Sequence, residues 1–322
     1  AYMLMRMLGI GPLGTLVSRG VLEVQDRIIL ADFVDRSGDT TLASAVTEAF
    51  RVDLGQSPTV TLVQGSDLAE AFRRMEREPP SMVTVELARE VAAREGIKAV
   101  VSGEISSVGG SYVLTAQVLE ASTGDVLVPL RETASDSTGL IAALDRLSKG
   151  LRERVGESLT SIRGGSDLER VTTGSLPALR RYSQATRASD AGDAGRAVTL
   201  FQEAIALDTT FAAAHRALSI QLSNYGIDRS LAITSMKKAY EYRDRLTEKE
   251  RLWTVGSYHM GRGETEEALN AYLTLLDMEP ERAAIYNNIG VLYNLTRQTE
   301  RALEYYEKSR DLEPTSFNAA FN

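Results

Sequence analysis

The first half of the chain alternates short runs of apolar and β-branched residues with stretches whose apolar positions recur at helical spacing. The short runs are bounded by turn residues, which is typical of strands: 27–33, 58–65, 97–108, 111–121 and 125–134. Helical spacing predicts helices over 42–57, 66–76, 84–96 and 140–162. The last three strands follow one another through glycine-containing turns, which indicates an antiparallel meander. This order predicts an α+β class, a mixed-sheet α/β sandwich whose helices cover the sheet.

The second half repeats a helical pattern at a nearly constant interval. Equivalent alanines are Ala197, Ala232, Ala268 and Ala302, so the steps are 35, 36 and 34 residues. This is the tetratricopeptide period, in which each repeat is a pair of helices. Small residues let the helices approach closely, and stacked pairs bury a continuous core. The interval therefore predicts that residues 177–322 form an all-α tetratricopeptide-repeat solenoid of about four repeats.

The repeat signature fades toward the front of the array. Gly256 and Gly290 hold the close-contact position of the last two repeats, whereas Ala185 and Ser219 stand there in the first two. We therefore expect the first two repeats to be irregular, and the second to carry an insertion around SNYGID, residues 223–228. The terminal FNAAFN reads as the start of a fifth repeat, which predicts that the array continues.

Several motifs of the first half occur in an order that resembles one known domain. They are DRIILADFVDRSGDTTL, the helix ending in LGQSP, LAREVAAREGIKAVVSGEI and SYVLTAQVLEASTGDVL. Along residues 27–160 they resemble the TolB-amino-terminal-like α/β domain of bacterial regulatory proteins. GIGPLGTLVSRGVL and RVTTGSLPALRRYSQA resemble the sensor region of bacterial membrane-anchored serine/threonine protein kinases. That resemblance implies an α/β domain that follows a membrane segment and leads into tetratricopeptide repeats. The sequence has no kinase signature, so a kinase would lie upstream of Ala1.

The N-terminal segment AYMLMRMLGIGPLGTLV is mostly apolar but carries Arg6, and GIGPLG would interrupt a helix near its end. Two interpretations stay open: the end of a transmembrane anchor, or a buried arm of a soluble domain. From the N-terminus, the predicted organisation is an arm over 1–26, an α/β domain over 27–163, a linker over 164–176 and repeats over 177–322.

Composition narrows the classes of function. A formal charge of −8 without a sustained basic run argues against a nucleic-acid-binding surface. Cysteine is absent, and His215 and His259 are the two histidines, so thiolate metal sites and histidine-based triads are hard to assemble. We predict no catalytic residue, no cofactor and no metal site, and expect that this segment is not an enzyme.

The segment ADFVDRSGD gathers three aspartates around a glycine at the end of a predicted strand. An EF-hand needs carboxylates at alternate positions and a bidentate glutamate, which this order lacks. A turn that caps the next helix accounts for Ser37, Gly38 and Asp39 without a ligand. Strand ends are nevertheless where α/β sheets bind ligands, so Asp32 and Asp35 are candidates for the lip of a ligand site. An enzyme with an unrecognised carboxylate at Asp32 is the least favoured alternative.

Four residues are candidates for a peptide-binding groove in the repeats: Tyr258, Arg262, Asn287 and Asn288. They stand on the first helices of their repeats, which the resemblance to tetratricopeptide proteins places along the concave face. Polar asparagine can hydrogen-bond an extended peptide backbone. The predicted partner is therefore a protein or peptide.

Two functions fit these features. A sensory region would couple binding of a ligand or partner to a membrane-anchored serine/threonine kinase, with the region on the extracytoplasmic side of a bacterial inner membrane. The alternative is a constitutive scaffold, which could lie in the cytoplasm. It would recruit a protein partner through the repeats without using the α/β domain. The sequence does not fix the oligomeric state.

Overall fold

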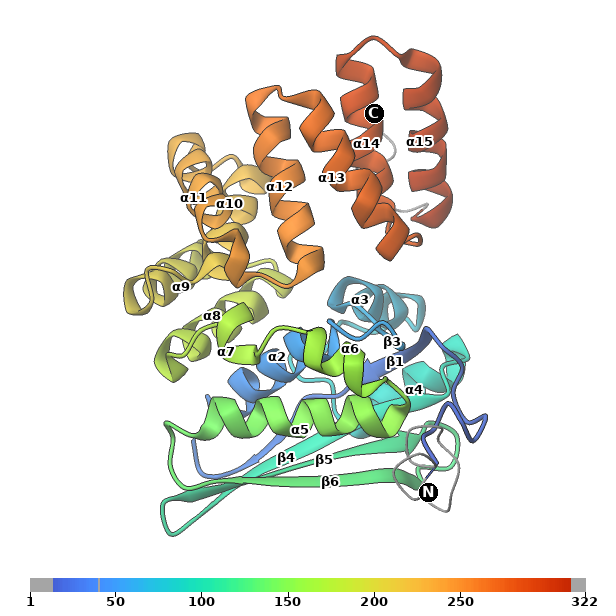
Figure 1. Ribbon diagram of the computed structural model, residues 1–322, viewed down its shortest axis with the longest axis vertical. Coiled ribbons are helices and arrows are strands. Elements are labelled where there is room, and N and C mark those ends of the chain that lie inside the picture. The colour runs from blue at the N-terminus through green and yellow to red at the C-terminus, as the bar shows by residue number, and fades with distance from the viewer. Residues whose placement is uncertain (1–13, 40, 314–322) are drawn as a thin grey trace. The chain divides into compact units, whose positions relative to one another are not determined.

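The computed structural model describes residues 14–39 and 41–313, and these form two compact units that divide between Thr209 and Thr210 (Figure 1). The first unit holds the sheet and the helices up to α9, and the second holds the helices from α10 onward. Among the described residues, no helix is both long and apolar enough to span a bilayer. The anchor interpretation of the N-terminal arm falls largely on residues 1–13, outside the described residues.

A sheet of mixed direction forms the centre of the first unit. Its described strands are β1 Asp26–Leu30, β2 Val34–Arg36, β3 Val60–Leu62, β4 Ala99–Val108, β5 Ser111–Glu120 and β6 Val126–Ala134. The strand order is β3-β1-β4-β5-β6, and β2 also pairs with β4. The pairs of β1 with β3 and β4 are parallel, whereas β4, β5 and β6 are antiparallel. The predicted meander and mixed sheet are therefore confirmed.

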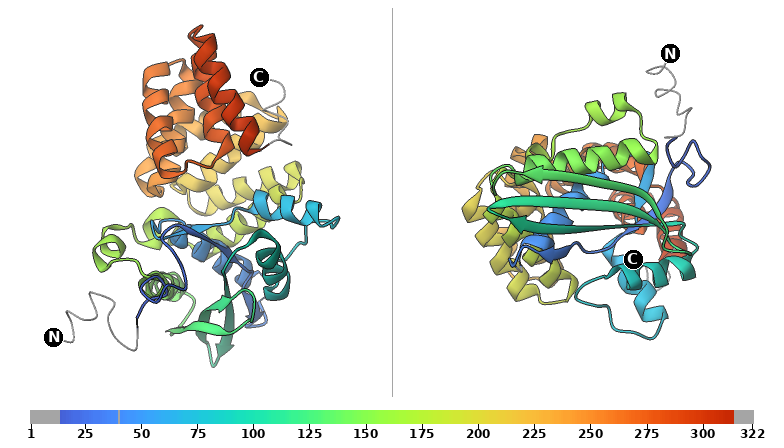
Figure 2. Two further views of the ribbon diagram at one scale, coloured as in Figure 1. Left: turned by 90° about the vertical axis from the view of Figure 1, so that its right-hand side faces the viewer. Right: turned by 90° about the horizontal axis from the view of Figure 1, so that it is seen from below.

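Helices cover the two faces of the sheet unequally. On one face, α2 (Leu42–Leu54) and α5 (Leu140–Val155) bury the larger core, which includes Phe33 and Phe50. On the other face, α3 (Gly65–Arg74) and α4 (Val85–Glu95) cover the β1 side in a smaller core. Seen from below, strands β4 to β6 lie in front, without a helix over most of their length (Figure 2). Part of the second face is therefore open.

Capping residues set both ends of α4, close to the limits of the helix predicted over 84–96. The Thr84 hydroxyl accepts a hydrogen bond from the Leu87 amide and caps the helix. Gly96 ends it with a φ of +67°, a left-handed conformation that glycine adopts at little cost.

Within the described residues, four antiparallel helix pairs follow the sheet. They are α8 Leu176–Asp190 with α9 Ala194–Leu207, α10 Ala212–Tyr225 with α11 Arg229–Glu241, α12 Glu248–Arg262 with α13 Thr265–Met278, and α14 Ala283–Leu295 with α15 Thr299–Leu312. The four alanines that set the repeat interval lie in the first turns of the second helices, and all are buried. The first pair belongs to the first unit, and α6 (Leu159–Gly164) and α7 (Leu168–Val171) lead into it.

The close-contact position of the last two repeats behaves as expected. A Cβ atom at Gly256 would lie 2.8 Å from the Tyr272 ring, and one at Gly290 would lie 2.6 Å from the Tyr306 ring. Because carbon atoms that are not bonded to each other do not pack so closely, glycine is what allows each tyrosine to lie on the first helix of its repeat.

The predicted insertion around SNYGID is wrong. Residues 226–228 join α10 to α11 in a turn of the same length as the one at 191–193 in the first repeat. Gly226, at a φ of +61°, is the helix stop. The extra residues instead follow α11, where 242–247 contains the short 3-10 turn Arg243–Arg245. The 35-residue step from Ala197 to Ala232 contains the turn at 226–228, whereas the 36-residue step from Ala232 to Ala268 contains 242–247.

Candidate interaction sites

Tyr258 and Arg262 lie together on α12, in the seam between α11 and α12. The Tyr258 ring stacks on Tyr240 of α11 with centroids 4.0 Å apart, and the Arg262 guanidinium lies over the Tyr258 ring at 5.5 Å. Glu264 accepts from Arg262 Nε at 2.8 Å and also pairs with His259. The Arg262 side chain is still 56% exposed, so its charge is held in place but accessible.

Asn287 and Asn288 are half-buried on α14. Asn288 hydrogen-bonds the hydroxyl of Tyr272, which also lies 2.9 Å from the Ser257 hydroxyl of α12. Burial raises the pKa of Tyr272 to about 12, so this phenol stays protonated near neutral pH. The structure thus uses Asn288 to join α14 to α13, and its role in a peptide groove stays a prediction, as does that of Asn287.

Sequence reasoning missed how regularly arginines cover aromatic rings in this region. Arg243 lies over Tyr240 at 4.4 Å, and Arg282 lies over Trp253 at 4.7 Å. The partners of the second pair are far apart in sequence, so no local motif could reveal it. These pairs hold large flat side chains at the surface in fixed orientations.

The two acids proposed as a ligand lip take part in the fold. Asp32 accepts a hydrogen bond from the Val83 amide at 2.7 Å and forms an ion pair with Arg187 of α8 at 2.8 Å. Asp35 accepts from both the amide and the hydroxyl of Ser37, which closes the turn. The two carboxylates therefore bind different partners. A ligand-binding role for them stays a prediction.

A second ion pair joins the same strand-end segment to α8. Arg180 donates to Asp39 at 2.6 Å, and it precedes Arg187 by about two helical turns, on the same side of the helix. Burial opposes ionisation of Asp39, but hydrogen bonds from Thr41 and the Arg180 charge outweigh it and lower the pKa of this carboxyl. Together, Asp32–Arg187 and Asp39–Arg180 form what we call the α8 clamp. The clamp attaches the first repeat helix to the sheet.

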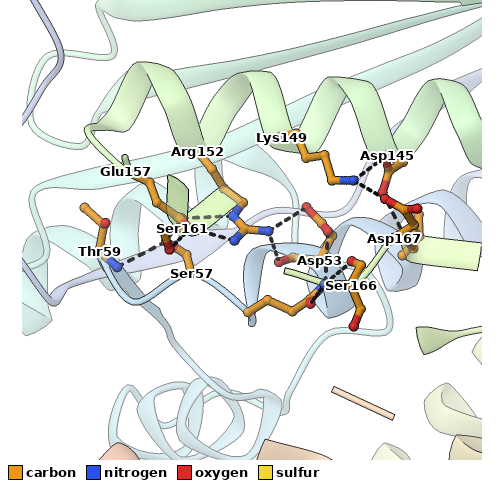
Figure 3. A network of polar contacts seen from close by, with 12 residues as sticks. Asp53, Ser57, Thr59, Asp145, Lys149, Arg152, Glu157, Ser161, Ser166 and Asp167 are labelled. Carbon is orange, nitrogen blue, oxygen red and sulfur yellow. Dashed lines mark hydrogen bonds and ion pairs between the residues drawn. The ribbon is translucent and has the colours of Figure 1, made fainter. Parts of the chain in front are cut away.

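A buried charge network links α2, α5 and the turn before α6 (Figure 3). The Arg152 side chain is 1% exposed and donates two hydrogen bonds to Glu157, at 2.7 and 2.9 Å. Asp53 lies 3.5 Å away on the other side of the guanidinium. Ser57 and Ser161 donate to the Glu157 carboxylate at 2.6 and 2.8 Å. The network therefore joins α5 to the turn before α6 and to the end of α2 through buried hydrogen bonds and ion pairs.

The two carboxylates of this network respond oppositely to burial. For Asp53, burial raises the pKa more than the Arg152 charge lowers it. For Glu157, burial also raises the pKa, but the hydrogen bonds from Arg152, Ser57 and Ser161 outweigh it and the net pKa falls. The bidentate partner of the guanidinium is therefore Glu157.

A hollow of about 550 Å³ opens on the uncovered face of the sheet. We call it the sheet hollow, and its lining is Val34, Val85, Ser102, Gly103, Glu104, Thr115, Ala116, Gln117, Pro129, Leu130 and Arg131. Glu104 pairs with Arg36 of β2 at 2.8 Å. Nothing in the sequence marked this site, because its residues come together only through strand register. In the described part of the molecule, no cluster of acids and histidines could hold a metal ion.

Comparison with known families adds one match. Residues 256–317 match the tetratricopeptide repeat family. The match begins inside α12 and runs past the end of α15, so it covers the region where both close-contact glycines meet their tyrosines. The tetratricopeptide repeats predicted from the alanine interval are therefore confirmed in this region, which is a protein-interaction scaffold. No curated protein sequence matches the chain.

Several solved structures are similar over part of the chain. The LpoB C-terminal domain from Escherichia coli has 20% identity and a TM-score of 0.33, covering 42% of this chain and 94% of its own. MamA from Desulfovibrio magneticus RS-1, from residue 41 to its end, has 20% identity and a TM-score of 0.34, covering 44% and 79%. YrrB, described as a tetratricopeptide protein with an unusual peptide-binding site, has 19% identity and a TM-score of 0.34, covering 57% and 86%. At such TM-scores these likenesses carry no functional inference, and the resemblance to TolB and to kinase sensor regions stays a prediction.

Proposed function

We propose that the chain is a non-catalytic protein-interaction region of a larger bacterial signalling protein, and that its repeats bind an extended peptide or protein segment. The observation that carries the proposal is the tetratricopeptide match over residues 256–317, on helices whose close-contact glycines and tyrosines pack as such repeats require.

The proposed groove lies along the first helices α12 and α14. Arg262 offers an exposed guanidinium that Tyr258 and Glu264 hold in one orientation, so little side-chain entropy is lost when an acidic group of the partner binds it. Asn287 offers an amide that can pair with a peptide backbone. A rigid cation and a half-buried amide on neighbouring first helices suit an extended segment with an acidic residue.

Truncation of the groove should weaken peptide binding. For peptides selected on the full-length protein from a displayed random library, Arg262→Ala and Asn287→Ala should each raise Kd about tenfold, because each removes a polar anchor. Asn294→Ala, on the exposed end of α14, is the matched control and should leave Kd unchanged. Fluorescence anisotropy of the labelled peptides measures this. Equal affinities for all three variants and the unaltered protein would place binding elsewhere.

We further propose that the region couples this binding to a membrane-anchored serine/threonine kinase. The sequence resemblance of the first half supports the setting, on the extracytoplasmic side of a bacterial inner membrane. The α8 clamp supports the coupling, because it joins the first repeat helix to the sheet through two ion pairs. A strain on α8 therefore reaches the strand-end segment directly. A constitutive scaffold, the alternative, needs no such link.

Release of the α8 clamp separates these two functions. The double variant Arg180→Gln, Arg187→Gln removes both ion pairs and keeps the hydrogen-bonding groups. In the parent protein, the coupling proposal expects unchanged peptide capture but an altered response of kinase activity to the peptide. An unaltered response, with capture retained, favours the constitutive scaffold.

A further inference from the structure

The sheet hollow has a polar floor, although it lies on a sheet whose other face is the main core. Side chains alternate along a strand, so Val101 and Ile105 of β4 enter the core, while Ser102 and Glu104 face the hollow. Cross-strand pairing extends this polar set over β5 and β6. All lining residues belong to the first unit.

Ser102 is buried without a hydrogen-bond partner. Its residue is 3% exposed, and its Oγ has no partner among the described residues. A buried hydroxyl left unpaired destabilises the fold, because it has lost its hydrogen bonds to water and gained none in the protein. A polar ligand group that enters the hollow and reaches this hydroxyl would remove that cost.

The hollow carries an unbalanced positive charge. Glu104 is neutralised by Arg36, with Nε and Oε2 2.8 Å apart. Arg131, at the β6 side, has no ion pair or side-chain hydrogen bond with any described residue, and it is exposed. The site therefore favours an anionic group next to Arg131.

Register fixes the distances between these groups. Ser102 pairs with Gln117 in one row, and Thr115 pairs with Arg131 in the next row on the same face. Neighbouring strands lie about 4.8 Å apart, so the floor from β4 to β6 spans about 10 Å. That span and the volume of the hollow suit a small ligand rather than a folded domain.

We propose that the sheet hollow binds a carboxylate group followed by an amide. Arg131 pairs with the carboxylate, and the amide of Gln117 and the hydroxyl of Ser102 hydrogen-bond the ligand amide. Val34 and Val85 line the hollow and contact the apolar part of the ligand. A free short peptide and the carboxyl terminus of a protein share this chemistry. The site is separate from the repeat groove and does not depend on it.

Isothermal titration calorimetry of the full-length protein with N-acetyl-glycyl-glycine tests the proposal. The structure predicts saturable binding that Arg131→Gln weakens about tenfold and Ser102→Ala weakens severalfold. Ser102→Ala removes an unpaired hydroxyl, so the variant should fold at least as well as the unaltered protein. Arg154→Gln, on α5 at the opposite face, is the charge-matched control and should bind normally.

Two further ligands separate the sources of the carboxylate. N-acetyl-glycyl-glycinamide lacks the carboxylate and should bind about tenfold more weakly. Glycyl-glycine has a free amino group: tighter binding than the acetylated form indicates a free peptide, and weaker binding indicates the carboxyl terminus of a protein. The proposal is overturned if neither N-acetyl-glycyl-glycine nor glycyl-glycine binds. It is also overturned if Arg131→Gln does not change their binding. Because the repeat groove is untouched by these variants, peptide capture by the repeats is unaffected by either result.

Discussion

Replacement of Arg152 by alanine should lower the free energy of unfolding by about 3–5 kcal/mol. The guanidinium is fully buried and is the cationic partner of both Asp53 and Glu157. Its removal leaves two carboxylates buried without a counter-charge, and the lost Coulomb energy is not recovered from water. Urea denaturation followed by circular dichroism measures the change.

Arg146→Ala provides the matched control on the same helix. Arg146 pairs with Glu132 at 3.0 Å, but its side chain is 53% exposed, so the pair should contribute roughly 1 kcal/mol or less. If the two alanine variants lost the same stability, the Arg152 network would not be the buried support that the structure indicates.

Acid should act on this network through Glu157. Its folded-state pKa lies below the ordinary 4.5, so its contribution to stability is present above pH 4.5 and is lost as pH falls through the folded-state pKa. Asp53 has a raised pKa and acts in the opposite direction, with its contribution lost as pH rises. The stability difference between the unaltered protein and Glu157→Gln should therefore shrink below pH 4.5.

Tyr272→Ala should destabilise the second unit by about 3–5 kcal/mol. The ring is fully buried, lies against Gly256 and the Trp253 ring, and its hydroxyl joins α12 to α14 through Ser257 and Asn288. Truncation leaves a cavity at the junction of the two confirmed repeats. Trp253, the one tryptophan of the sequence, reports the loss by fluorescence during urea denaturation.

Two further variants serve as comparisons for the stability of Tyr272→Ala. Tyr272→Phe keeps the ring and removes the hydroxyl, so it should cost about 1 kcal/mol. Tyr225→Ala removes a tyrosine that is 54% exposed on α10 and should change stability by roughly 0.5 kcal/mol or less. Equal losses for Tyr225→Ala and Tyr272→Ala would contradict the packing described for the repeats.

Features that depend on local chemistry were predictable. The alanine interval gave the helix pairs, since each repeat needs a small residue where its helices meet. The three-strand meander followed from β-type runs and glycine turns, and Thr84 and Gly96 marked the limits of α4. These signals lie within a few residues of the element that they define.

Features that depend on distant partners were not predictable. Asp32 read as a ligand candidate because its partner Arg187 lies 155 residues away, and only the fold brings α8 to that strand end. The burial of Arg152 could not be predicted from its own helix, since its acids come from α2 and from the following turn. The sheet hollow needed the register of three strands. A sequence pattern tells on which face of a helix or strand a residue lies, but not which residue of another element packs against it.

Hydrogen–deuterium exchange of the full-length protein, with and without a peptide selected on it, tests the central claim most directly. If the repeats form the protein-interaction site, the peptide, amidated at its carboxyl terminus so that it lacks the carboxylate proposed for the sheet hollow, should slow exchange in α12 and α14 and leave β4 to β6 unchanged. Protection confined to the sheet, or no protection within residues 248–295, would contradict the assignment of the interaction site to the tetratricopeptide repeats.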